Sequence, residues 1–153
     1  MIKSLFAQVI ERLSPGESVS AEDREAGLRL ATAVLMIEVA RADHVFDESE
    51  FDKVLQLVQA HFGLSAGDSA DLVVDASARA EDLVDIHQFT KLLHDCLTED
   101  EKAQIVSLLW QIAYADGELD KYEDSLVLKI SDLLYVSRGR VMRLKNDVGK
   151  AVT

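Results

Sequence analysis

The chain contains 153 residues, enough for one domain with a buried core, and its hydrophobic content of 48% excludes an intrinsically disordered protein. One proline and seven glycines are few for the many turns of an all-β protein, so the composition favours helices. The formal charge of −12 repels phosphates and disfavours nucleic-acid binding, while the single cysteine, Cys96, leaves no disulfide within the chain and fits the cytoplasm.

Residues 1–20 predict an amphipathic helix followed by a linker. Apolar residues recur at the spacing of one helix face, at Ile2, Leu5, Phe6, Val9, Ile10 and Leu13. Gln8 and Glu11 interrupt this run, so it lacks the continuous apolar stretch of a secretion signal. No stretch approaches the roughly 18–20 apolar residues of a membrane span. We therefore expect the helix to dock on its own domain, with a linker at 14–20 before a helical domain over 21–153.

A long helix is predicted after Ser20, which offers an N-cap before the acidic first turn of the helix. Between Leu30 and Ala40 the sequence is apolar on nearly every helix face. A helix that is apolar all round is buried on most sides, so this segment should be the central element of the domain. A second, amphipathic helix is expected from Glu48 to His61.

The second half of the chain repeats this plan. Thr98 followed by Glu101 predicts a capping box, and an apolar run then extends to Ala113. An amphipathic helix follows over 121–135. One constant shift places Leu35 on Leu108, Ala40 on Ala113, Asp43 on Asp116, Asp47 on Asp120, Glu50 on Glu123 and Val54 on Val127. The sequence thus predicts an internal repeat, over about 28–65 and 101–137, of two similar helix–acidic turn–helix units.

Three more amphipathic helices are expected, over 66–83, 85–97 and 137–152. Together these patterns predict an all-α single domain of seven or eight helices. The last helix concentrates basic residues, Arg138, Arg140, Arg143, Lys145 and Lys150, against Asp147 alone. We expect them to complement the acidic body and the C-terminal dipole of their own helix, with docking to an acidic partner as the alternative.

Two acidic turns carry the candidate site. The stretch "YADGELDKYE" contains Asp116, Asp120 and Glu123, and "ADHVFDESE" repeats the spacing with Asp43, Asp47 and Glu50. One interpretation is structural: Asp120 and Glu123, like Asp47 and Glu50, would form capping boxes, and Gly117 would supply a left-handed helix end.

The other interpretation is a metal site. Asp116 and Asp43 end helices, where the helix dipole disfavours an anion. Each carboxylate therefore requires a hydrogen-bond donor or a cation as its partner. A backbone amide of the turn could supply it, or the carboxylates could bind a divalent cation such as Ca²⁺ or Mg²⁺. The turn is not an EF-hand, because Lys121 and Val127 stand where that loop requires glycine and glutamate.

An apolar helix that ends in Ala-Asp-Gly, with an acidic turn and a glutamate opening the next helix, resembles the TerB-like family of tellurite-resistance proteins. The related N-terminal domain of DnaJ-like membrane co-chaperones shares this pattern. The stretch "IAYADGELDKYE" matches closely, and "VARADHVFDESE" matches more loosely because His44 replaces the expected glycine. The resemblance implies an all-α, mostly cytoplasmic bacterial domain linked to tellurite resistance or stress, without established enzymatic activity. It also implies that the acidic positions are the family's signature.

Two functions remain open from the sequence. The first is a non-enzymatic interaction or stress-response domain with a protein partner and a cation at its acidic turns. The alternative is a metal-assisted hydrolase that uses Asp116, Asp120 and Glu123, although the sequence places no evident base, nucleophile or positive group beside them. Other candidates are thin: Cys96 is expected to be a small apolar helix residue, and His87 and His94 are too far apart on one helix to chelate a metal together.

Overall fold

The structure, a computed structural model, describes residues 20–42, 48–115, 117 and 119–151. These residues form seven helices, α2 (Ala21–Ala40), α3 (Glu48–Phe62), α4 (Ala66–Glu81), α5 (His87–Cys96), α6 (Glu99–Ala113), α7 (Lys121–Leu133) and α8 (Arg138–Ala151). No strand occurs in this part of the chain. The prediction of an all-α domain is confirmed, and the expected helix near the N-terminus lies outside the described residues.

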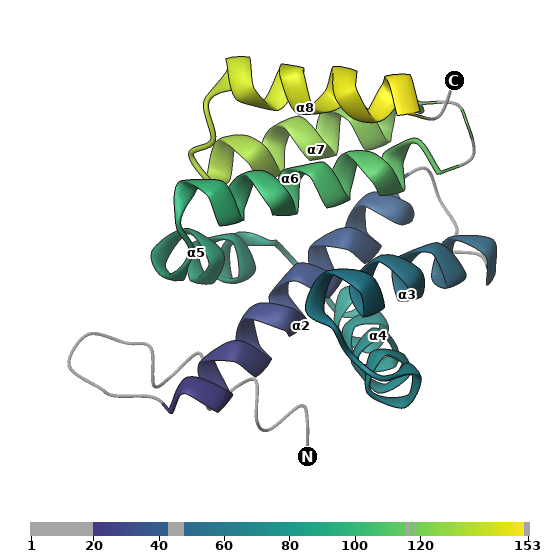
Figure 1. The fold of residues 1–153 in the computed structure, drawn as a ribbon, viewed down its shortest axis with the longest axis vertical. Coiled ribbons are helices and arrows are strands. Elements are labelled where there is room, and N and C mark those ends of the chain that lie inside the picture. Colours follow the sequence, from purple (N-terminus) through teal and green to yellow (C-terminus); the bar gives the residue numbers. More distant parts are fainter. Residues whose placement is uncertain (1–19, 43–47, 116, 118, 152–153) are drawn as a thin grey trace.

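Helix α2 is the centre of the fold, as its all-round apolar sequence predicts. It packs against α3, α4, α5, α6 and α7, and eleven of its twenty residues are buried. Figure 1 shows α2 crossing the molecule obliquely, with α6, α7 and α8 stacked on one side of it. The N-cap is also as predicted, because the Ser20 hydroxyl accepts a hydrogen bond from the Asp23 amide at 3.1 Å.

The two repeated units, α2–α3 and α6–α7, have corresponding buried positions. Leu35 and Ala40 of α2, and their counterparts Leu108 and Ala113 of α6, all belong to one hydrophobic core. In Figure 1 both α2 and α6 end, and both α3 and α7 begin, on the right-hand side of the view. Because α2 and α6 also pack on each other, the repeat brings the ends of its two long helices to one side of the domain.

The basic residues of α8 pair with the acidic body of the domain. Arg138 contacts Asp132 at 2.9 Å, Arg140 contacts Asp100 at 2.8 Å and Lys145 contacts Asp124 at 2.7 Å. The partners lie on α6 and α7, so these cations help to hold the last helix against the second repeated unit. The expectation that α8 complements its own domain is confirmed for these three residues.

The capping box at the start of α6 gives a first prediction. The Thr98 hydroxyl accepts from the Glu101 amide at 3.2 Å, and the Glu101 carboxylate accepts from the Thr98 amide at 2.9 Å. We expect Thr98→Ala to lower the free energy of unfolding by about 1 kcal/mol, measured by urea denaturation. Thr98→Ser keeps the hydroxyl and should lose much less. An equal loss in both variants would show that the methyl group, and not the cap, is responsible.

Candidate functional site

The turn between α6 and α7 begins as the sequence predicts. Helix α6 ends with Tyr114 as its C-cap, and the amide of Gly117 donates a hydrogen bond to the Tyr114 carbonyl at 2.9 Å. Gly117 has a φ of 86°, in the left-handed region that favours glycine. The chain then enters α7 with Asp120 as the N-cap in an extended conformation. Gly117 thus has the left-handed conformation that the sequence predicts after the end of α6.

The predicted side-chain cap of Asp120 is wrong. Its backbone carbonyl accepts from the Asp124 amide at 2.9 Å, as in any helix start, but its carboxylate makes no capping hydrogen bond. Instead, the Asp120 Oδ2 atom is buried and has no hydrogen-bond partner within the described residues. A desolvated carboxylate oxygen without a partner is costly, commonly by about 1–3 kcal/mol or more. The Asp120 carboxylate therefore does not serve as the cap of its own helix.

Glu123 lies one turn further along α7 and is buried, with only 5% of its surface exposed. Buried glutamates are rare unless they are paired or bound to a metal. The N-terminus of α7 therefore carries a buried glutamate, Glu123, and a partly buried aspartate, Asp120, of which the Oδ2 atom is buried. Both sit where the positive end of the helix dipole favours negative charge.

The remaining predicted ligands are only partly within the described chain. Asp43, Asp47 and Asp116 lie outside the described residues, as does the predicted cap of Asp47 with Glu50. Glu50 is partly buried in the first turn of α3. Within the described ranges no three acidic, histidine or cysteine side chains form a group that could hold a metal ion. A complete metal site would therefore need at least one ligand from outside the described ranges, such as Asp116.

A hollow of about 420 Å³ lies next to the second acidic turn. It is bounded by Lys53 of α3, by Gln111, Tyr114 and Ala115 at the end of α6, and by Asp147, Val148 and Ala151 of α8. Lys53, from the first repeated unit, thus lines the same hollow as Ala115, the residue directly before Asp116. Sequence reasoning missed this cation, because only the packing of α3 on α6 brings it there. The hollow therefore has one lysine, Lys53, and one aspartate, Asp147, in its lining.

Gly149 of α8 allows Tyr114 to pack closely at this hollow. A Cβ atom added at Gly149 would lie 3.2 Å from the Tyr114 hydroxyl oxygen. Tyr114 is the C-cap of α6, so the glycine lets α8 approach the helix end that leads into the acidic turn. The part of the hollow that Tyr114 lines is therefore positioned by the packing of α8 against the end of α6.

The histidines are engaged apart from one another. His61 packs edge-on against Phe62, His87 Nδ1 lies 3.0 Å from Asp85, and His94 Nδ1 lies 2.6 Å from Lys102 Nζ. None of these contacts brings two histidines together.

Cys96, a further candidate from the sequence, and Glu38 of α2 behave as structural residues. Burial raises the pKa of the Cys96 thiol, which keeps it protonated and fits the expected apolar role. Burial also raises the pKa of Glu38, and Arg41, 4.0 Å away at i+3, partly offsets that rise. An acid and a base at i and i+3 lie on the same face of a helix, which accounts for this pairing.

Fold and turn together define a class of protein. The chain is an all-α domain of two helix–acidic turn–helix units, with the buried Glu123 in the first turn of the second unit's outer helix. The family model described as tellurite resistance protein TerB matches residues 29–146, and the chain belongs to this family. No curated protein and no solved structure matches the chain. Among the described helices, none is both long and apolar enough to cross a membrane.

Proposed function

We propose that this chain is a non-enzymatic, cytoplasmic interaction domain of the tellurite-resistance type, which binds a divalent cation at its acidic inter-helix turns. The observation that carries the proposal is the buried Asp120 Oδ2 atom, which has no hydrogen-bond partner in the described part of the chain. A Ca²⁺ or Mg²⁺ ion would satisfy this oxygen, since both ions prefer carboxylate ligands. Glu123 and Asp116 are the proposed further ligands, with Asp43, Asp47 and Glu50 as the corresponding set in the first unit.

Cation binding would change how the helices of the two repeated units are oriented relative to each other. The second turn follows α6, and α6 packs on the central helix α2. A cation that draws Asp116 towards Asp120 and Glu123 would fix the entry angle of α7. The hollow with Lys53 lies beside the same turn and would change with it. A protein partner that contacts this side of the domain would then bind more tightly or more weakly depending on whether the cation is present.

Calorimetric titration of the whole chain with Ca²⁺, Mg²⁺, Mn²⁺ and Zn²⁺ tests the cation site. We expect heat of binding with the wild type at or below about 1 mM metal. Asp116→Asn and Asp120→Asn should each weaken binding by about tenfold or more, because a neutral amide is a poorer cation ligand. Asp71→Asn, an exposed position on α4, is the matched control and should bind as the wild type does. Absence of heat with every metal would exclude the site.

Asp120→Asn also separates the cation site from a simple helix cap. In metal-free buffer we expect its free energy of unfolding to equal or exceed that of the wild type, because a buried charge has been removed. A loss of about 1 kcal/mol would instead indicate a cap. Turnover of a phosphoester that is lost in Asp116→Asn would favour the alternative, a metal-assisted hydrolase.

A further inference from the structure

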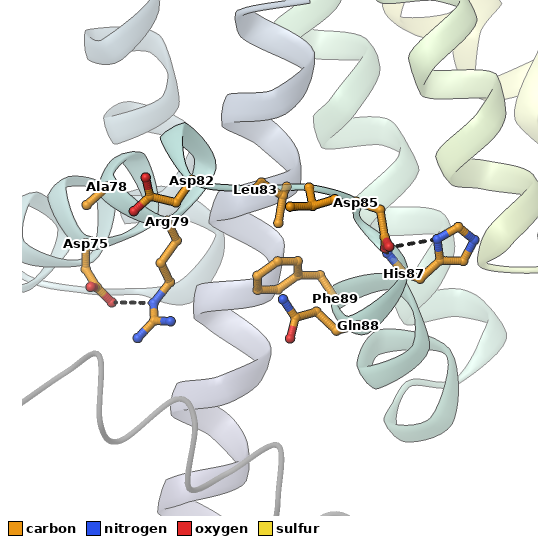
Figure 2. Close-up of a pocket in the computed structure, with 10 residues that line it drawn as sticks. Asp75, Ala78, Arg79, Asp82, Leu83, Asp85, His87, Gln88 and Phe89 are labelled. Atoms are coloured by element: carbon orange, nitrogen blue, oxygen red, sulfur yellow. Dashed lines mark hydrogen bonds and ion pairs between the residues drawn. The ribbon is translucent and has the colours of Figure 1, made fainter.

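Two hollows of the domain differ in whether their charged groups are already paired. The larger one, of about 530 Å³, lies where α4 ends and α5 begins (Figure 2). Its two basic side chains, Arg79 and His87, each contact an aspartate of the same lining, at 3.5 Å and 3.0 Å. In the hollow beside the second acidic turn, Lys53 and Asp147 form no ion pair with each other or with another described residue. The smaller hollow therefore presents unpaired charges to a molecule that enters it.

Lys53 differs from the other lysines of the described chain that are withdrawn from water. Three of these lysines, Lys53, Lys102 and Lys145, are buried or partly buried. Lys102 contacts Glu99 at 3.2 Å, and Lys145 contacts Asp124 at 2.7 Å. An ammonium group loses hydration when it is withdrawn from water, and this loss is costly unless an opposite charge offsets it. A ligand with one negative charge would supply the partner that Lys53 lacks among the described residues.

Two further polar side chains line this hollow from the end of α6. Gln111 and Tyr114 lie three residues apart and therefore on one face of the helix. The Tyr114 hydroxyl group makes no hydrogen bond with another described residue, and the close approach of Gly149 restricts where its ring can lie. The Gln111 amide group donates one long hydrogen bond of 3.4 Å within α6. Its carbonyl oxygen can therefore accept a hydrogen bond from a ligand.

These four side chains define the chemistry of a ligand. Lys53 and Tyr114 can donate hydrogen bonds, and they suit a carboxylate, which only accepts them. Asp147 and the carbonyl oxygen of Gln111 are acceptors, and they suit an N–H group of the ligand. The carboxylate of Asp147 and the formal charge of −12 disfavour a multiply charged anion such as phosphate. The volume of about 420 Å³ is in the range of small-molecule sites.

We infer that this hollow binds a ligand with one carboxylate and a neighbouring N–H group. Lys53 pairs with the carboxylate, and Asp147 accepts from the N–H group. A free amino acid and an acidic residue of a partner protein both present this chemistry. The inference does not rest on the proposed cation site, because no residue of the lining is a proposed cation ligand.

Titration of the isotope-labelled full chain, followed by NMR, tests this site in buffer freed of metal ions by a chelating resin. One probe is L-glutamine, a free amino acid, and the other is the blocked peptide acetyl-Gly-Glu-Gly-amide, which represents an acidic residue of a protein. We expect saturable shifts of the Gln111, Ala115 and Val148 amide signals at or below about 10 mM probe. The probe that binds more tightly identifies the source of the ligand. Absence of saturable shifts with both probes would overturn the inference.

Matched variants and probes show whether Lys53 and the carboxylate are responsible. Lys53→Gln should weaken binding by about tenfold or more, because it removes a hydrogen bond between two charged groups. Lys129→Gln, at an exposed position on α7, changes the net charge equally and should bind as the wild type does. Each probe with its carboxylate converted to an amide should give no saturable shift. Equal binding by the wild type and Lys53→Gln, or by a probe and its amide, would contradict the inference.

Discussion

Replacing Trp110 by alanine is expected to lower the free energy of unfolding by about 3–5 kcal/mol. Trp110 is fully buried in α6 and is the largest of the fully buried side chains in the described core. Its indole nitrogen donates a hydrogen bond to the Val141 carbonyl of α8 at 3.2 Å. Lys145 of α8 also lies over its ring, 5.2 Å from the ring centre. One side chain thus fills the core and joins α6 to α8.

Urea denaturation followed by far-UV circular dichroism measures this loss without relying on tryptophan fluorescence. Trp110→Phe keeps most of the apolar volume but removes the indole hydrogen bond to the Val141 carbonyl, so we expect a smaller loss of about 1–3 kcal/mol. Tyr122→Ala removes an aromatic ring that is 54% exposed and should change stability by about 0.5 kcal/mol or less. A loss for Trp110→Ala no larger than that for Tyr122→Ala would contradict the central role of Trp110.

The helices could be predicted because their signals are local. Ser20 and Thr98 mark helix starts through side chain to backbone bonds that span three residues. The central position of α2 also follows from sequence, since a helix that is apolar on every face has to be surrounded. Repetition adds a constraint, because two segments with the same buried positions, such as Leu35 and Leu108, adopt the same local structure.

The site could be predicted only in part, because its remaining features depend on tertiary contacts. The spacing of Asp120 and Glu123 fits a capping box, yet Asp120 makes no capping bond and its Oδ2 atom is buried without a partner. Local spacing shows which bond a side chain can make, whereas the packing around it decides whether that bond forms. Lys53 and Ala115 line one hollow although their helices, α3 and α6, are far apart in the sequence, so this arrangement leaves no local pattern.

Lys102 is a further feature without a signal in the sequence. It lies in the first turns of α6, where a lysine is ordinarily exposed, but it is only 2% exposed. Its ammonium group lies 2.6 Å from His94 Nδ1 of α5 and 3.2 Å from the Glu99 carboxylate. Glu99 is itself 67% exposed, so His94 is the more buried of the two partners that hold the charge inside the domain.

We therefore expect an asymmetry between two substitutions in this pair. His94→Leu removes the acceptor and leaves a buried ammonium with one exposed partner, which should lower the free energy of unfolding by about 1–3 kcal/mol. Lys102→Met removes the charge itself and fills a similar volume, so its cost should be clearly smaller. Urea denaturation of both variants and of the double variant measures the difference.

The double variant provides the decisive comparison. If His94 serves mainly to hold the Lys102 charge, His94→Leu should cost little once Lys102 is already methionine, and the two effects will not add. His94 also stacks on Tyr135, with ring centres 4.6 Å apart, and Tyr135→Ala measures that contribution separately. Tyr135 has a φ of 60°, and alanine keeps the same backbone strain, so the comparison isolates the ring. Strictly additive losses would mean that His94 stabilises the domain through Tyr135 and not through the buried lysine.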